Sequence, residues 1–188
     1  MPVYRMKKQP DLTVSVERIT WEGIDVPVSL DTDWFAYWLK EQPGLDFSVS
    51  KPISGTIHLE RHDDNILVRG HLLGELNFTC SRCLDVFAAP LAVDFDLLLK
   101  IGRPPIPAQE VELDSGDLDE DYFQDDELDL NALLREQILL TLPLKPLCRE
   151  ECRGLCRLCG ANLNREPCSC TAPKLNSSFA ALEKLKND

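Results

Sequence analysis

The hydrophobic pattern of the first half of the chain predicts β-strands. Apolar residues occupy every second position from Leu12 to Val16 and from Ile24 to Val28, and this period marks strands with one buried face. Residues 53–101 predict an antiparallel meander, because apolar runs are separated by turn-forming residues such as those at 62–65. The longest alternating run consists of Leu91, Val93, Phe95, Leu97 and Leu99.

An aromatic cluster at residues 34–38 predicts a short helix. It follows Asp31 and Asp33, and an aspartate is a favourable N-cap. The rings are expected to pack in the core rather than to stack on bases, because no Lys or Arg lies between Trp34 and Trp38.

Helical periodicity replaces alternation in the last third of the chain. From Leu130 to Leu142 apolar residues recur every three or four positions, Asp129 or Asn131 can cap the start, and Pro143 ends the segment. This helix is apolar enough to be buried. A last short helix is predicted after Ser177 or Ser178, with its apolar face formed by Phe179, Leu182 and Leu185.

Eight cysteines add a chemical signal to this pattern. Six lie in the stretch CREECRGLCRLCGANLNREPCSC at 148–170, and two form a Cys-x-x-Cys at the tip of a predicted hairpin. Thiolates bind Zn²⁺ in tetrahedral sets of four, so the eight fit two sets, and Gly154 and Gly160 suit tight metal-binding turns. The predicted metal ligands are Cys80, Cys83, Cys148, Cys152, Cys156, Cys159, Cys168 and Cys170.

Three other interpretations of the cysteines remain open. Disulfides are disfavoured because the N-terminal MPVYRMKKQP does not resemble a secretory signal, and closely spaced cysteines in a reducing cytosol more often hold metal. An iron-sulfur cluster also takes four thiolates. A redox Cys-x-x-Cys usually opens a helix in a thioredoxin-like pattern, which is absent around Cys80.

The eight cysteines can be divided in two ways. In the first, Cys156, Cys159, Cys168 and Cys170 form a local set, and Cys80, Cys83, Cys148 and Cys152 form a long-range set that clips the middle of the chain to its C-terminal part. In the second, the two Cys-x-x-Cys turns pair as a zinc ribbon, and the remaining four cysteines group together. The spacing alone is compatible with both, and with one zinc ion or two.

The charge of the chain is concentrated in one segment. The formal net charge is −12, and residues 110–129 contain eleven acids and no Lys or Arg, so the rest of the chain carries about −1. This balance argues against a generic phosphate-binding surface. Dense like charge predicts a flexible acidic loop at 110–129, which can also attract a basic partner.

Catalytic signatures are missing from the sequence. There is no phosphate-binding glycine loop, no Gly-x-Ser-x-Gly and no His-Glu-x-x-His. All-thiolate zinc sites are usually closed and structural. We therefore expect a non-enzymatic protein, the alternative being a thiol redox or metal-dependent enzyme acting in RNA metabolism. No apolar run is long enough to span a membrane, so a cytoplasmic protein without membrane or small-molecule partners is expected.

The predicted fold class is α+β. A mainly antiparallel β-sheet or partly closed barrel would carry a buried helix and a C-terminal cysteine-rich, zinc-binding appendage. The predicted divisions are a β domain at 1–109 with the hairpin Cys-x-x-Cys, the acidic loop at 110–129, and the helix with the cysteine-rich region at 130–188.

The order of these features resembles the YceD family of bacterial and plastid proteins. The resemblance covers roughly residues 50–188 and is carried by the hairpin Cys-x-x-Cys, the acidic region, ELDLNALLREQILLTLPLKPLC, CRGLCRLCGANLN and the final Cys-x-Cys. It implies a role in synthesis, processing or stability of 23S ribosomal RNA during assembly of the large ribosomal subunit. It implies no known catalytic activity.

Two modes of action follow for an acidic protein that affects RNA. Arg149, Arg153 and Arg157 could contact phosphate, because residues 145–188 hold eight Lys or Arg against five acids and zinc knuckles bind RNA. Alternatively the acidic loop, through Asp119, Glu120 and Asp121, binds a basic ribosomal protein or assembly factor. The overall charge slightly favours the second mode. In either case the expected partner is the large-subunit precursor.

Overall fold

A five-stranded sheet forms the body of the protein in a computed structural model that describes residues 12–42, 44–103 and 120–170. Its strands, in spatial order, are β2 (Ile24–Leu30), β3 (Phe47–His62), β4 (Asn65–Thr79), β5 (Val86–Ile101) and β6 (Glu120–Phe123). The first four pair antiparallel, whereas β6 runs parallel to β5. The short strands β1 (Thr13–Ser15) and β7 (Glu127–Asp129) pair separately, and η1 (Val16–Arg18) is one 3-10 turn.

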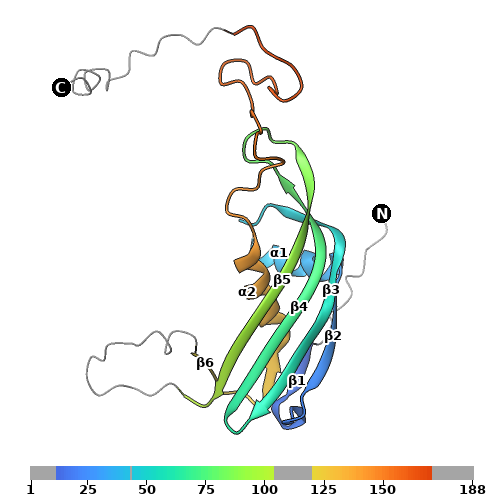
Figure 1. The fold of residues 1–188 in the computed structure, drawn as a ribbon, viewed down its shortest axis with the longest axis vertical. Coiled ribbons are helices and arrows are strands. Elements are labelled where there is room, and N and C mark those ends of the chain that lie inside the picture. Colours follow the sequence, from blue (N-terminus) through green and yellow to red (C-terminus); the bar gives the residue numbers. More distant parts are fainter. Residues whose placement is uncertain (1–11, 43, 104–119, 171–188) are drawn as a thin grey trace, which may run out of the picture.

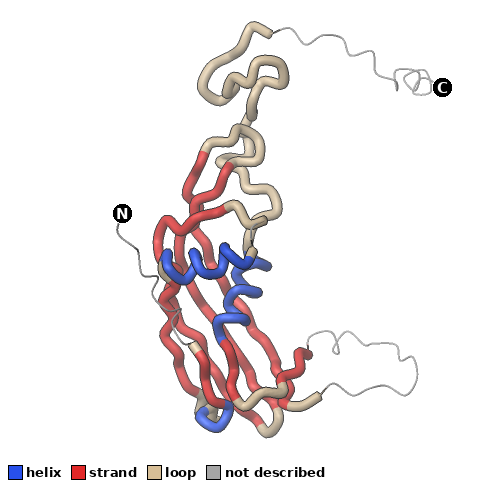
Figure 2. The backbone as a smooth tube through the Cα atoms, turned by 180° about the vertical axis from the view of Figure 1, so that it is seen from behind, coloured by secondary structure: helices blue, strands red, loops and turns tan. Residues whose placement is uncertain are grey.

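The two helices lie on the same face of the sheet (Figure 2). Helix α1 (Thr32–Glu41) begins after Asp31, whose side chain accepts hydrogen bonds from the amides of Asp33 and Trp34. Helix α2 (Leu130–Thr141) begins after Asp129, which accepts from the amide of Asn131. Both predicted helices are confirmed, and Asp129 rather than Asn131 caps the second one.

The core lies between this sheet face and the helices. Alternate residues of the central strands, including Ile57, Leu59, Ile66 and Val68, are fully buried, because a strand sends successive side chains to opposite faces. Trp34, Phe35 and Trp38 are buried among them, with the rings of Trp34 and Phe35 edge to face at 4.9 Å. The expected role of the aromatic cluster in the core is therefore confirmed.

The predicted fold class is also confirmed. The antiparallel meander of residues 53–101 corresponds to β3, β4 and β5. The described sheet is open, since β2 and β6 are its two edges. The β4–β5 hairpin extends past the helices and meets the cysteine-rich segment at one end of the molecule, opposite the end that carries β6 (Figure 1).

Helix α2 is less buried than its sequence predicts. Leu130, Leu134 and Ile138 face the core, but Leu139 and Leu140 are 46% and 74% exposed. A helix turns by about 100° per residue, so the two leucines that widen the apolar stripe leave the face that packs on the sheet.

The acidic segment differs from the loop predicted at 110–129. Its described part contains β6 and β7, because β6 pairs with the last residues of β5 and Phe123 and Leu128 pack against the core. Residues 104–119, which include Asp119, lie outside the described part of the chain, as does the helix predicted after Ser177. Among the described helices, none has the length and apolarity required to cross a membrane.

A buried hydrogen bond joins the two helices. The indole Nε1 of Trp34 donates to Oδ1 of Asn131 at 2.8 Å. We expect Asn131→Leu to destabilise the fold by about 1–3 kcal/mol, because it leaves the buried indole N–H without an acceptor. Urea unfolding monitored by tryptophan fluorescence measures the effect, with Asn77→Ala, at a half-buried position of β4 outside the core, as the control. An unchanged midpoint would contradict this role.

Candidate metal centres

The eight cysteines form two groups of four. Within each group the Sγ atoms all lie within 4.8 Å of one another. The first group, here called the hairpin site, consists of Cys80, Cys83, Cys148 and Cys152; the second, the knuckle site, consists of Cys156, Cys159, Cys168 and Cys170. This is the first of the two divisions that the sequence allows. The zinc-ribbon pairing of the two Cys-x-x-Cys turns is not formed.

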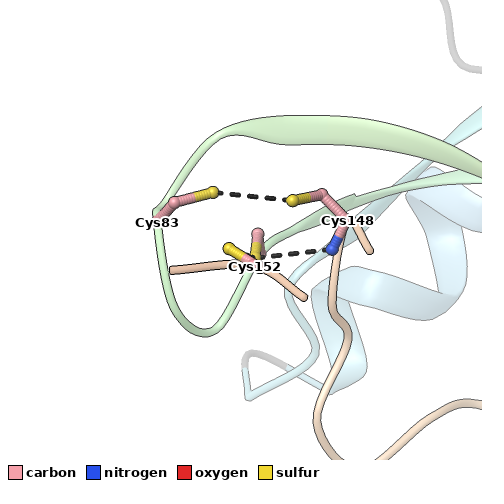
Figure 3. A group of neighbouring side chains, drawn as sticks. Cys83, Cys148 and Cys152 are labelled. Carbon is pink, nitrogen blue, oxygen red and sulfur yellow. Dashed lines mark hydrogen bonds between the residues drawn. The ribbon is translucent and has the colours of Figure 1, made fainter. Parts of the chain in front are cut away.

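The hairpin site joins parts of the chain that are distant in sequence. Cys80 and Cys83 occupy the turn between β4 and β5, where the amide of Cys80 donates to the carbonyl of Asp85 at 2.9 Å. Cys148 and Cys152 come from the segment after α2 and reach the same turn, and Cys83 and Cys148 point toward each other (Figure 3). The amide of Ser81 donates to the carbonyl of Pro146 and holds the two segments together.

The sulfur distances of the hairpin site fit a tetrahedral metal ion. The Sγ atoms of Cys80 and Cys152 are 3.8 Å apart, and those of Cys83 and Cys148 are 3.7 Å apart. Four sulfurs at about 2.3 Å from one ion in tetrahedral geometry lie about 3.8 Å from each other. The donor set and its spacing therefore suit Zn²⁺, and they are too wide for a disulfide, whose sulfurs are about 2.05 Å apart.

Hydrogen bonds from backbone amides favour the ionised form of some of these thiols. Burial opposes ionisation of Cys80, but hydrogen bonds from the backbone amides of Cys148, Cys83 and Arg82 outweigh it and lower the pKa of this thiol to about 6. The amide of Asp85 favours the thiolate of Cys83, yet burial and contact with the other three thiols raise the pKa of Cys83 to about 12. Clustered thiolates repel one another, and a divalent cation removes that repulsion.

The knuckle site is formed by a short local loop. The amide of Cys156 donates to the carbonyl of Ala161 at 2.8 Å, and the amide of Gly160 donates to the carbonyl of Cys156 at 2.9 Å. Backbone amides of Cys159 and Leu158 lower the pKa of the Cys156 thiol to about 6. The hydrogen bond with Cys159, together with burial, raises the pKa of Cys170 to about 12. The same division of pKa values therefore occurs in both sites.

The two Cys-x-x-Cys turns share a backbone conformation. The residue after the second cysteine has a positive φ in each, 61° at Leu84 and 74° at Gly160. Glycine accepts this left-handed conformation without strain, whereas a leucine does not. The glycine after Cys159 was recognisable in the sequence as a turn signal, and Leu84 was not.

The two sites differ in burial. Cys80, Cys83 and Cys152 are buried, and they pack with Leu147 and Leu155 in a small apolar cluster separate from the main core. Cys159 and Cys170 are exposed. The hairpin site is therefore the more protected of the two from chelators and oxidants.

The remaining predicted site residues are scattered. Arg149, Arg153 and Arg157 are exposed, and Arg149 and Arg153 line a hollow of about 420 Å³ beside the hairpin site that Arg157 does not reach. Among the residues described, none of the three arginines has a carboxylate partner. Glu120 and Asp121 belong to β6, at the end of β5 distant from the cysteines.

The three histidines lie on the strands, away from both cysteine groups. His58 contacts Asp25 through Nδ1 at 2.6 Å and Glu60 through Nε2 at 3.0 Å. The hydrogen bond with Asp25 is the main reason that the pKa of His58 is raised. His71 pairs with Asp94 on the next strand. These contacts connect side chains on the outer face of the sheet. The histidines therefore belong to neither cysteine group.

Sequence reasoning missed the polar residues that support the sulfurs. Asn164 donates through Nδ2 to Sγ of Cys152 at 3.3 Å, and Arg82 donates to the carbonyl oxygens of Glu150 and Cys152. Asp85 accepts from Asn162 and Arg165, at 2.8 Å in both cases. Two asparagines in the CGANLN stretch were the only local signal, since asparagine favours turns.

Comparisons with known proteins converge on one family. The family model described as large ribosomal RNA subunit accumulation protein YceD matches residues 68–186. The chain is 26% identical over 149 residues to a protein of Zea mays named large ribosomal RNA subunit accumulation protein YCED homolog 1, chloroplastic, covering 66% of this chain and 50% of that protein. It is 30% identical over 60 residues to the Arabidopsis thaliana protein of the same name, covering 32% and 19%.

A bacterial relative covers a similar region. The chain is 28% identical over 116 residues to an uncharacterized protein of Mycobacterium leprae, covering 62% of this chain and 51% of that protein. The chain thus spans about half the length, or less, of these curated relatives. No solved structure has significant similarity to the chain.

Metal analysis tests whether the two groups are zinc sites. We expect two zinc ions per chain in protein purified without added metal, with all eight thiols protected from a thiol reagent until a chelator is added, because each group offers a full tetrahedral donor set. The double variant Cys80→Ser/Cys83→Ser should retain about one ion. Elemental analysis with thiol titration gives both numbers. Iron, or eight freely reactive thiols without metal, would contradict the assignment.

Proposed function

The chain belongs to the YceD family of large ribosomal RNA subunit accumulation proteins, and on this basis we propose that it supports the synthesis, processing or stability of 23S ribosomal RNA during large-subunit assembly. It acts as a non-enzymatic factor with structural zinc. The family match carries the proposal, because residues 68–186 include all eight cysteines and helix α2.

The chemistry of the donor sets supports a structural rather than a catalytic metal. A catalytic zinc site keeps one coordination position for water or substrate, usually among histidine or carboxylate ligands. Each group here has four thiolates within reach of one ion, and the histidines lie elsewhere on the sheet. When bound, zinc would neutralise part of the thiolate charge and crosslink the chain.

The hairpin site gives this crosslink a large effect on the fold. Cys83 and Cys148 are separated by 65 positions in the sequence, so joining them closes a long loop and removes conformational entropy from the unfolded chain. The four cysteines of the hairpin site would thereby hold the arginine-bearing segment 149–157 rigidly on the tip of the β4–β5 hairpin. The factor presents a fixed surface to its partner.

The proposed partner is the large-subunit precursor, reached through a basic ribosomal protein or assembly factor, through ribosomal RNA, or through both. The net charge of −12 favours a basic protein, which the acidic segment around Asp119, Glu120 and Asp121 would attract. Arg149, Arg153 and Arg157 are the candidates for phosphate contact. Each four-thiolate zinc site is formally −2, which weakens the local basic excess.

We expect the protein to work in the cytoplasm. Ribosomal precursors are assembled in that compartment in bacteria, and a reducing environment keeps the cysteines available as metal ligands. Neither a membrane nor a small-molecule substrate enters the proposed function.

Depletion of the protein in its host tests the role in RNA accumulation. We expect the ratio of 23S to 16S ribosomal RNA to fall, and wild-type protein to restore it. Cys80→Ser/Cys83→Ser should fail to restore it, because the hairpin is no longer clipped to the C-terminal segment. Asn77→Ala, at a half-buried strand position outside the core and the cysteine groups, is the control that should restore it fully. An unchanged ratio on depletion would sink the proposal.

Paired variants distinguish the two modes of contact. If these arginines contact RNA, Arg149→Gln/Arg153→Gln/Arg157→Gln should weaken RNA binding. The slope of log affinity against log salt concentration should fall by the equivalent of up to about three phosphate contacts. Asp119→Asn/Glu120→Gln/Asp121→Asn should instead slow association with large-subunit precursors if a basic protein is the target. Binding titrations across salt concentrations measure both, with zinc content confirming the fold. If neither variant changes association, both contact surfaces are wrong.

A further inference from the structure

The loop of the knuckle site carries a residue that contacts the hairpin site. Asn164 lies between Cys159 and Cys168, in the loop whose two ends are knuckle-site ligands. Its Nδ2 donates to Sγ of Cys152, a hairpin-site ligand, at 3.3 Å. One side chain therefore belongs by sequence to one metal site and by contact to the other.

Both ends of the Asn164 amide group are held. Its Oδ1 accepts from the backbone amide of Arg153 at 2.8 Å. Its Nδ2 also donates to Oδ1 of Asn162 at 3.0 Å, and the same oxygen accepts from the backbone amide of Asn164 at 3.0 Å. An amide side chain supplies both a donor to sulfur and an acceptor to Arg153.

The hairpin turn binds this loop through Asp85. Asp85, just after the hairpin Cys-x-x-Cys, accepts from Nδ2 of Asn162 and from the guanidinium of Arg165, each at 2.8 Å. A chain of hydrogen bonds thus runs from Asp85 through Asn162 and Asn164 to Cys152. The loop is therefore bound to the hairpin turn at Asp85 and to the hairpin site at Cys152.

The short segment between the two sites leaves little freedom for separate movement. The amide of Leu155 donates to the carbonyl of Arg82 at 3.1 Å, and the amide of Leu163 donates to the carbonyl of Gly154 at 2.9 Å. Gly154 has a φ of 72°, and a Cβ at this position would lie 2.9 Å from the carbonyl oxygen of Arg82. The knuckle loop is therefore packed directly on the hairpin.

We propose that the two metal sites are coupled through Asn164, so that zinc in the knuckle site strengthens zinc binding in the hairpin site. This inference rests on the proposed function in that both sites hold zinc. Ligation of Cys159 and Cys168 fixes the ends of the loop and so places the Asn164 donor on the Cys152 sulfur. Asn164 is a positioning residue, not a ligand.

The expected size of the coupling follows from the chemistry of metal ligands. A hydrogen bond to a ligating sulfur stabilises the thiolate that binds the metal, and loss of such a supporting partner typically weakens metal affinity 10–100-fold. Because coupling between two binding sites is reciprocal, zinc in the hairpin site strengthens the knuckle site by the same factor.

A double-mutant cycle on the full chain tests the coupling. Cys168→Ser/Cys170→Ser disables the knuckle site, and competition with a chelator then measures the zinc affinity of the hairpin site. We expect this affinity to be about 10–100-fold weaker than that of the same site in the wild-type chain with both sites filled. Asn164→Ala should cause a similar loss on its own, and adding it to Cys168→Ser/Cys170→Ser should cause little further loss.

Additive losses, or no loss, would overturn the coupling. Asn164→Asp keeps an acceptor for the Arg153 amide but lacks the donor to sulfur, so it should weaken the hairpin site at least as much as alanine. A wild-type affinity in Asn164→Asp would assign Asn164 a purely structural role. Asn77→Ala, which replaces a half-buried asparagine of β4, is the matched control. Co²⁺ in place of zinc reports each tetrathiolate site by its absorption.

The outcomes separate this inference from the proposed function. A wild-type chain without bound metal would remove the zinc assignment and the coupling together. Two zinc ions with independent affinities would leave the proposed function intact and remove only the coupling. If Cys168→Ser/Cys170→Ser does not fold, native mass spectrometry of Asn164→Ala at limiting zinc replaces it, and an unchanged ratio of one-zinc to two-zinc species relative to the wild type would overturn the proposal.

Discussion

The arrangement of the cysteine-bearing end depends on one long-range junction, the meeting of Cys80 and Cys83 with Cys148 and Cys152. These four sulfurs lie within 4.8 Å of one another although the chain between them builds most of the sheet and helix α2. Four clustered thiolates repel one another at short range, so ionisation of all four thiols would need a cation between them. The junction is therefore where the proposed metal binding would be coupled to folding.

The sheet and helices explain how this junction is reached. Helix α2 packs on β5 and shares its core with α1, to which it is joined by the Trp34–Asn131 hydrogen bond. Its end directs the following segment back to the β4–β5 turn, where Ser81 and Pro146 bond through their backbones. The part of the hairpin that extends beyond the helices cannot pack against them. Its buried contacts come instead from the small cluster around Cys80, Cys83 and Cys152.

Strand β6, in the described part of the acidic segment, and the cysteine-rich segment lie at opposite ends of the molecule (Figure 1). Strand β6 pairs with the last residues of β5, whereas the hairpin site follows the end of β4. This separation allows the two contact modes considered for an acidic protein to operate on different surfaces.

Local patterns in the sequence were sufficient for the strands, the capped helices, the buried aromatic rings and the eight candidate ligands, because these depend on neighbours within a few residues. The tertiary structure alone decided which cysteines group together, since sulfurs that are distant in sequence are brought together only by the path of the whole chain. It also decided that part of the acidic segment is strand, that Leu139 and Leu140 face outward, and that Asn164 supports Cys152. Each of these outcomes depends on a contact with another segment, and the local sequence pattern does not indicate which segment that is.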